Sequence, residues 1–142
     1  GCVASPLGRM RYTAVATRSF AARWFPNGLD RDALEAAPRV DFDRHDTLQS
    51  AFARRHGARH EPPRHVISAS AEFAQAITLG LGWGMLLPGQ FEEGVTDGSL
   101  VVLADDTIEV PLYWQRWNLS SALLDTVTDA VRRTAADSPA LG

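Results

Sequence analysis

The stretch RHVISASAEFAQAITLGLGWGMLLPGQ, residues 64–90, decides the fold because it holds a complete strand–helix–strand pattern. Its first five residues, 64–68, contain the apolar pair Val66 and Ile67, which predicts a short strand. An amphipathic helix follows, because Phe73, Ile77 and Leu81 recur every four residues. The apolar run after it, bounded by glycine and proline, is typical of a strand buried on both faces. Two strands joined in this way by a helix predict a parallel sheet.

Hydroxyl and carboxylate side chains gather where this helix begins, at Ser68, Ser70 and Glu72. Two interpretations are open at this point. The serines can cap the helix, which contributes on the order of 1 kcal/mol. Alternatively, the hydroxyls and the free N–H groups of a helix start can hold an anion, and an amino-acid carboxylate is the better specified choice. Ligands of parallel sheets bind at the carboxyl ends of strands, so this turn is the first candidate site.

Three alternating glycines, Gly80, Gly82 and Gly84, resemble part of a dinucleotide-binding fingerprint. That fingerprint must follow a strand and open a helix. Here the glycines follow the predicted helix and open the predicted strand. We therefore interpret them as a helix end and a tight turn, and the sequence predicts no cofactor.

The second candidate site is the acidic segment RVDFDRHD, residues 39–46. Apolar and charged side chains alternate at its start, which predicts a short strand with Asp41 facing solvent and Phe42 facing the interior. Asp43 shares the face of Asp41 unless the strand ends before it. Acidic side chains near the carboxyl end of a strand can bind a cationic group, and Asp41, Asp43 and Asp46 are the candidates.

Asp46 has a competing structural role, because it precedes a predicted helix, TLQSAFARRHG. Aspartate is a favourable N-cap, and Gln49 stands where a capping box places a glutamine. Gly57 ends the same segment as a C-cap. A role in binding therefore competes with a role in capping at Asp46.

The rest of the chain continues the alternation of strands and helices, which predicts an α/β fold. We expect a strand at 10–17 after a turn at 7–8, helices capped by Ser19 and Asp30, a helix at 91–98, strands at 99–103 and 108–117 separated by a turn at 105–106, and a final helix that Ser120 or Ser121 caps. Pro111 places the last strand at a sheet edge or bends it.

Composition narrows the functional classes. The 142 residues are 45% hydrophobic and carry a net charge of −3, so the chain as a whole lacks the basic character of nucleic-acid-binding proteins. The single cysteine favours a reducing compartment. The four histidines lack metal-ligand spacing, and no nucleophile elbow occurs, which argues against an enzyme. We expect no membrane span.

Several runs together resemble one family, the LysR-type transcriptional regulators, in its effector domain. The branch that they resemble most is LysG/ArgP, which senses lysine and arginine and controls basic amino-acid export. The runs follow each other in order along nearly the whole chain: LGRMRYTAVA (7–16), FAARWFPNG (20–28), FDRHD (42–46), SAEF (70–73), GLGWGMLLP (80–88) and LYWQRW (112–117).

This resemblance implies a fold like that of the type-2 periplasmic binding proteins, with two α/β lobes and a ligand cleft between them. Residues 1–9 would be a crossover segment, 10–111 the second lobe, 112–136 the strand and helix that return to the first lobe, and 137–142 a tail. The winged helix-turn-helix DNA-binding domain and most of the first lobe would lie upstream, absent from this chain.

The resemblance also implies a function. Ser70 and Ser68 would receive the α-carboxylate of a basic amino acid, and Asp43, with Asp46 or Glu72 as second choices, would receive its amine or guanidinium. The protein would be a cytoplasmic homodimer or homotetramer that binds DNA through its N-terminal domain, without contact with a membrane. The alternative is a solute-binding protein of a transporter, which has the same fold but requires an export signal.

Overall fold

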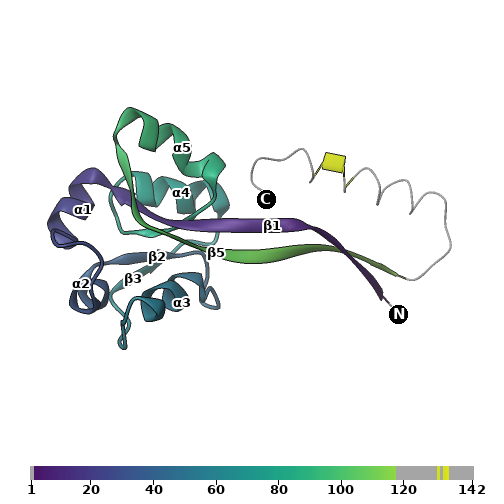
Figure 1. Cartoon of the computed structure of the whole chain (residues 1–142), viewed down its shortest axis with the longest axis horizontal. Coiled ribbons are helices and arrows are strands. Elements are labelled where there is room, and N and C mark those ends of the chain that lie inside the picture. The colour runs from purple at the N-terminus through teal and green to yellow at the C-terminus, as the bar shows by residue number, and fades with distance from the viewer. Residues whose placement is uncertain (1, 118–130, 132, 135–142) are drawn as a thin grey trace. The chain divides into compact units, whose positions relative to one another are not determined.

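The computed structural model of the chain describes residues 2–117, 131, 133 and 134. Strands and helices alternate along it, as the sequence predicts (Figure 1). In order they are β1 (Cys2–Thr17), α1 (Arg18–Trp24), α2 (Arg31–Ala36), β2 (Arg39–Asp41), α3 (Leu48–Arg55), β3 (Arg64–Val66), α4 (Ser70–Thr78), β4 (Gly84–Leu86), α5 (Pro88–Asp97) and β5 (Leu100–Trp117).

The strands form two sheets. The larger has the order β4–β1–β5, and β1 pairs with β4 antiparallel, with Thr13 opposite Leu86. The smaller pairs β2 with β3 in parallel, with Arg39 opposite Arg64 and Asp41 opposite Val66. Since β5 lies at an edge of its sheet, the proline at position 111 occurs where a missing N–H is tolerated, as predicted.

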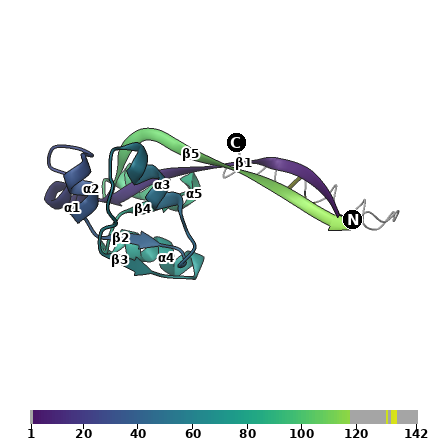
Figure 2. The same ribbon diagram turned by 90° about the horizontal axis from the view of Figure 1, so that it is seen from below.

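The strand–helix–strand pattern of residues 64–90 is confirmed. Arg39 forms a parallel bridge with Trp83, and the N–H of Val40 donates to the carbonyl of Trp83 at 2.9 Å. The chain entering β4 therefore runs parallel to β2, with β3 parallel on the other side of β2. Figure 2 shows α4 beside β2 and β3. All three residues of β4 are buried, which explains the continuous apolar run there.

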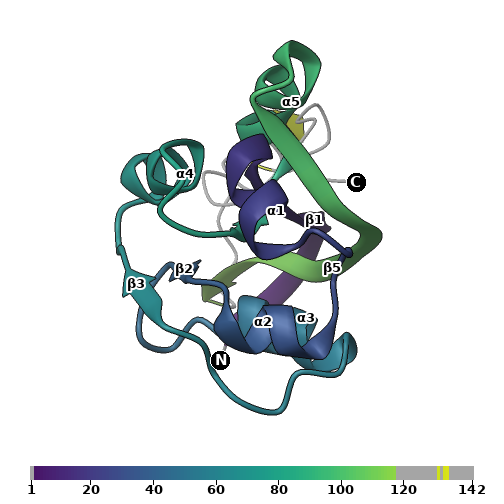
Figure 3. The same ribbon diagram turned by 90° about the vertical axis from the view of Figure 1, so that its left-hand side faces the viewer.

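Both faces of β1 are buried near its end, from Thr13 to Ala16, and each face there belongs to a different hydrophobic cluster. Ala14 and Ala16 belong to one cluster, with Phe20, Leu34 and Phe52 of α1, α2 and α3. The opposite face contributes to the other cluster, which contains these buried residues: Val15, Val40, Phe73, Ala76, Ile77, Leu86 and Leu100. Successive side chains of a strand point to opposite faces, so β1 joins the two halves of the core. Figure 3 shows α2 and α3 side by side, and α4 apart from them.

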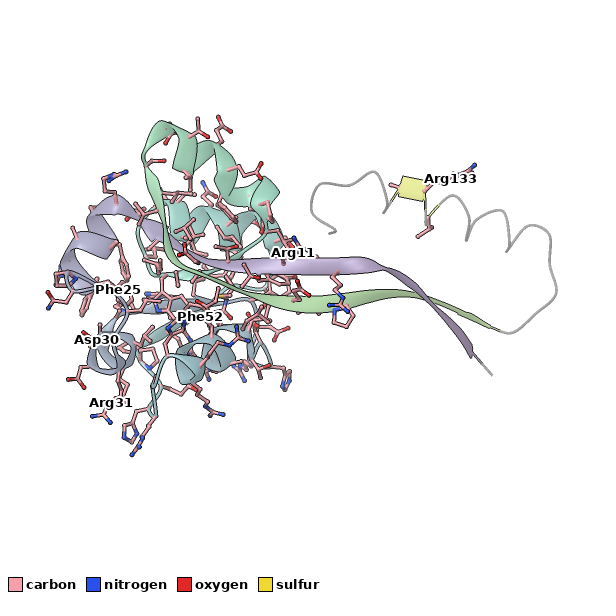
Figure 4. The ribbon with its side chains drawn as sticks, viewed as in Figure 1. Arg11, Phe25, Asp30, Arg31, Phe52 and Arg133 are labelled. Atoms are coloured by element: carbon pink, nitrogen blue, oxygen red, sulfur yellow. The ribbon has the colours of Figure 1, made fainter. Side chains whose placement is uncertain are left out.

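Helix α2 follows the local signals of the sequence. The N–H of Ala33 donates to Oδ1 of Asp30 at 2.7 Å, so the predicted N-cap is confirmed. Figure 4 labels Asp30 and Arg31 at this helix start, and Phe52 of α3.

Three local predictions are wrong. No turn occurs at residues 7–8 or 105–106, because β1 and β5 continue through these positions. Gly8 has a φ of 142°, a conformation that glycine tolerates within a strand. Helix α1 is capped by Thr17, whose Oγ1 accepts from the N–H of Phe20 at 3.1 Å, and not by Ser19. The predicted start of the final helix, at Ser120 or Ser121, lies outside the described residues.

Backbone contacts divide the chain into two units. Residues 12–108 form one, here named the central unit, and the remainder forms the terminal unit. Within the terminal unit, Glu109 accepts a hydrogen bond from Nη1 of Arg9 at 2.9 Å and pairs with Nε of Arg11 at 3.3 Å. The hydrogen bond from Arg9 lowers the pKa of Glu109, an exposed carboxylate. All the predicted binding residues belong to the central unit.

Candidate functional site

The two candidate segments meet at one edge of the small sheet. β2 and β3 are parallel, with Asp41 opposite Val66. Asp43 lies two residues after Asp41, and Ser68 lies two residues after Val66. The ladder extends one step further, since the N–H of Ile67 donates to the carbonyl of Asp41 at 3.0 Å. The acidic turn after β2 and the serine turn after β3 therefore leave the sheet as neighbours. This is the edge where α/β proteins usually bind ligands.

An aromatic contact connects the acidic turn to α4. The rings of Phe42 and Phe73 meet edge to face, with centroids 6.0 Å apart. Phe73 is buried in the first turn of α4, whereas Ser70 and Glu72 on the same turn are exposed. The helix start is thus held against the sheet by its apolar side, with its polar side chains facing solvent.

The serines do not cap α4. The N-cap position is Ala69, and no side chain accepts a hydrogen bond from the first N–H groups of the helix. Ser68 stands one residue before this position, and Ser70 stands one residue after it. Both are exposed, and neither hydroxyl has a partner among the described residues. The capping interpretation is therefore wrong, and the helix leaves both hydroxyls available to a ligand.

Asp43 and Asp46 shape the turn that they occupy. Asp43 accepts the N–H of His45 through Oδ1 at 2.7 Å. Asp46 accepts the N–H of Phe42 at 2.9 Å through one oxygen and the N–H of Leu48 at 3.1 Å through the other. Asp46 therefore closes the turn and supports the start of α3, although the N-cap position itself is Thr47. Asp43 makes a single exposed contact and keeps one oxygen available.

The predicted capping box at Gln49 is wrong. Its side chain is fully buried, and neither amide atom has a hydrogen-bond partner in the described part of the molecule. Phe52 and Ala53 follow Gln49 at the i+3 and i+4 positions of α3. All three side chains therefore lie on the helix face that packs into the core. Packing of that face orients the glutamine inward, away from the helix start.

Asp41 does not face solvent, contrary to the prediction. Its carboxylate is buried and accepts from Nε of Arg39 at 3.0 Å and from Nη1 of Arg64 at 3.2 Å. The prediction failed because simple alternation assumed one solvent face, whereas β2 is buried on both. The signal was available: residues two apart on a strand share a face, so an Arg-x-Asp pair in a buried strand indicates an internal ion pair.

The same network reaches α3 and the loop before β3. Nη2 of Arg39 contacts Glu61, and it also donates to Oγ of Ser50 at 3.0 Å. Burial alone would raise the pKa of Glu61, but the hydroxyl of Ser50 and the charge of Arg39 lower it below its usual value. These contacts hold β2, β3 and α3 together behind the two turns.

Tyr12 is a residue at this edge that sequence reasoning missed. It precedes Thr13, which pairs with Leu86 at the carboxyl end of β4. Burial, and then the negative charge of Asp46, raise the pKa of Tyr12 above its ordinary value.

The glycines after α4 are turn and packing positions, in agreement with the sequence interpretation. Gly80 has a φ of 82° just after the helix. A Cβ at Gly82 would lie 3.0 Å from the carbonyl oxygen of Pro38, and one at Gly84 would lie 2.6 Å from Cδ1 of Ile77. The described residues include no group of three side chains able to hold a metal ion. They also include no helix long and apolar enough to cross a membrane.

Comparisons with known proteins agree on one family. No protein-family model matches the chain. The regulator LysG of Mycobacterium tuberculosis is 38% identical over 136 residues, which are 95% of this chain and 45% of that protein. The chain spans about half the length of the curated relatives it matches, which are regulators called LysG or ArgP.

Two solved structures place this likeness in three dimensions. The C-terminal domains of a LysR family protein from Agrobacterium tumefaciens are 34% identical, with a TM-score of 0.89 over 96% of this chain and 67% of that one. Full-length LysG from Corynebacterium glutamicum, solved with the bound effector Arg, is 33% identical, with a TM-score of 0.83 over 96% of this chain and 46% of that one.

These likenesses confirm the predicted fold class, an α/β effector domain of the type found in periplasmic binding proteins. They also confirm the family that the sequence runs suggested. The chain belongs to the LysR family of transcriptional regulators, within which it is similar to LysG and ArgP.

Proposed function

We propose that this chain is the ligand-sensing part of a LysR-type regulator that binds lysine or arginine and controls genes for amino-acid export. The observation that carries the proposal is the parallel register of β2 and β3, which brings the acidic turn and the serine turn to one edge. Support comes from the likeness to a LysG whose structure holds the effector Arg.

The chemistry of the edge suits a basic amino acid. The hydroxyls of Ser68 and Ser70, with the free N–H groups at the start of α4, receive the α-carboxylate. The available oxygen of Asp43 receives the amine or guanidinium of the side chain. Charge-assisted pairs of this kind are roughly twice as strong as neutral hydrogen bonds, and they favour a long cationic side chain.

Asp46 and Glu72 have lesser roles in this arrangement. Both oxygens of Asp46 already accept backbone N–H groups, so it contributes negative charge and the shape of the turn. Glu72 is exposed on α4 and adds a further negative charge.

We also propose the organisation of the whole regulator. Residues 10–111 form the second lobe, 1–9 cross over to it, and 112–136 return to the first lobe, with 137–142 as a tail. The division into units after residues 11 and 108 supports boundaries close to these. DNA is bound by a winged helix-turn-helix domain outside this chain, and the regulator acts in the cytoplasm as a homodimer or homotetramer.

The effector acts by linkage. It binds one arrangement of the regulator more tightly than the other. The difference in binding free energy shifts the equilibrium of the DNA-bound regulator toward the arrangement that binds the effector better. No bond is made or broken in this function, and no cofactor is required. The relatives that support it are transcriptional regulators.

A melting experiment on the full-length protein tests the proposal. A ligand at 100 times its dissociation constant stabilises the folded state by about 2.7 kcal/mol. For a protein of this size class, that raises the melting temperature by roughly 2–4 °C. Lysine and arginine should produce the shift, whereas leucine and glutamate should not. Equal melting temperatures with and without both basic amino acids would refute the assignment.

A further inference from the structure

A cavity lies beside the start of β2, whereas the candidate effector edge lies after its end. It has a volume of about 480 Å³, and its lining includes Thr17 at the end of β1 and Pro38 just before β2. The candidate effector residues, in contrast, follow β2 and β3. Helix α1 and the turn after α4 form its walls, and α1 faces the viewer in Figure 3.

Apolar side chains form part of the walls of this cavity, and polar groups form the rest. Phe20 and Trp24 of α1 form one side, and Leu79 and Leu81 of the turn after α4 form the other. Leu79 is 70% exposed and Leu81 is 47% exposed, the two highest values among the exposed large hydrophobic side chains of the described residues. Apolar side chains gathered around a cavity of several hundred Å³ are typical of a small-molecule site.

One cation stands at the rim. The guanidinium of Arg23 lies 5.0 Å from the ring centre of Trp24, which holds it beside the cavity. No carboxylate pairs with Arg23 in the part of the chain that the structure describes, and no acidic side chain lines the cavity there. The hydroxyl of Ser19 adds a second polar group, hydrogen-bonded to Oγ1 of Thr17 at 3.3 Å.

We propose that this cavity is a second ligand site, which binds a small carboxylate with a planar apolar body, such as an aromatic acid. The planar body lies between α1 and the leucines, where it covers apolar surface that is otherwise in water. The carboxylate pairs with Arg23, whose fork of N–H donors matches two carboxylate oxygens. The site is independent of the proposed effector edge and adds a second chemical input to the same domain.

The test titrates the full-length protein with 2-naphthoate and follows binding by calorimetry. Saturable binding with one site per chain is expected. Arg23→Gln should weaken it at least about tenfold, because a charge-assisted pair is lost. Leu79→Ser should weaken it as well, while leaving melting temperature unchanged because this side chain is exposed. The neutral analogue 2-naphthalenemethanol should bind more weakly than the acid.

Two variants serve as controls. Arg59→Gln removes an exposed arginine that does not line this cavity, and binding of 2-naphthoate should not change. Asp43→Ala alters the proposed effector edge and should leave 2-naphthoate binding intact, which separates failure of this site from failure of the proposed function. The proposal is overturned if 2-naphthoate does not bind at millimolar concentration, if Arg23→Gln binds it as well as the wild type, or if arginine displaces it.

Discussion

Arg39 and Asp41 form a buried ion pair on one face of β2: Nε of the arginine donates to Oδ1 of the aspartate at 3.0 Å, and the two side chains are 1% and 0% exposed. Arg64, from the neighbouring strand, contacts the other carboxylate oxygen at 3.2 Å. Asp41, held by both arginines, therefore connects β2 and β3, the strands from which the acidic turn and the serine turn leave. The integrity of these contacts decides whether those turns stay adjacent.

We expect Asp41→Ala to destabilise the protein by about 3–5 kcal/mol, because it removes the buried partner of Arg39 and leaves that arginine only the half-exposed Glu61. Urea unfolding measures the loss. The matched control is Asp32→Ala, which removes a carboxylate that is 92% exposed and 3.9 Å from Arg31, and which should change stability by less than about 1 kcal/mol. Equal unfolding midpoints for the two variants would show that the buried pair contributes nothing.

Asp43→Ala should abolish the response to basic amino acids and keep the fold. Within the described residues its side chain makes one hydrogen bond, an exposed one from the N–H of His45, so the stability cost should be about 1 kcal/mol or less. Titration calorimetry with arginine should show at least about tenfold weaker binding, as expected when a charge-assisted contact is lost. Asp105→Ala, at an exposed aspartate of β5, is the control. Unchanged arginine affinity in Asp43→Ala would move the cation-binding role to another residue.

Asp46→Ala separates the two turn carboxylates. This variant loses two acceptors of backbone N–H groups and should destabilise by about 1–2 kcal/mol. Weaker arginine binding there would accompany a lower melting temperature, whereas Asp43→Ala should weaken binding alone.

Gly84→Ala should destabilise the protein by about 1–3 kcal/mol through overpacking. The new methyl would lie 2.6 Å from Cδ1 of Ile77 and 3.2 Å from the carbonyl oxygen of Val40. Gly89→Ala is the matched control, because its Cβ would meet nothing within 4 Å and it lies in α5. Thermal melting compares the two. A destabilisation as large in Gly89→Ala would point to a backbone effect in place of the close approach at Gly84.

Acid should weaken the attachment of α3 to β5. Burial alone would raise the pKa of Asp106, but its hydrogen bonds with His56, at 3.0 Å, and with Arg55 lower it. A carboxyl with a lowered folded-state pKa stabilises the fold above the ordinary aspartate value of about 3.9, and this stabilisation is lost as pH falls through the lowered value.

The difference in unfolding free energy between wild type and Asp106→Asn measures this contribution. The difference measured at about pH 5 should shrink as the pH falls below about 4. The comparison isolates one group, because the other acidic residues titrate in both proteins. A difference that does not change with pH would exclude the proposed role of this carboxylate.

Several elements could be predicted because their signals are local. The cap at Asp30 acts on an N–H three residues away, and the glycine at position 80 adopts its positive φ next to the helix that it ends. Phe73 and Ile77 recur with the helical period, so the buried face of α4 was evident. In each case the interacting groups are within about one helical turn in the chain.

The candidate site was harder to predict because contacts distant in sequence decide it. Alternation placed Asp41 in solvent, but α4 packs against β2, Ser50 of α3 bonds Arg39, and the partner Arg64 lies 23 residues away. The positions of Ser68 and Ser70 near the expected helix start predicted that they cap α4. The helix begins so that Ala69 is the N-cap residue instead. The inward orientation of Gln49 likewise depends on packing against the core.

The sequence by itself determined the strand–helix–strand pattern of residues 64–90 and the α/β alternation, because periodicity and turn residues act over short distances. It also determined the family, because the motif runs are visible in the sequence without a structure. Only the tertiary structure decided that Asp41 is an internal ion-pair partner, that Asp46 is already occupied by backbone N–H groups, and that the two serine hydroxyls are unused by the helix. The physical reason is that a charged or polar side chain finds its lowest free energy by pairing with whichever groups the packed strands bring to it.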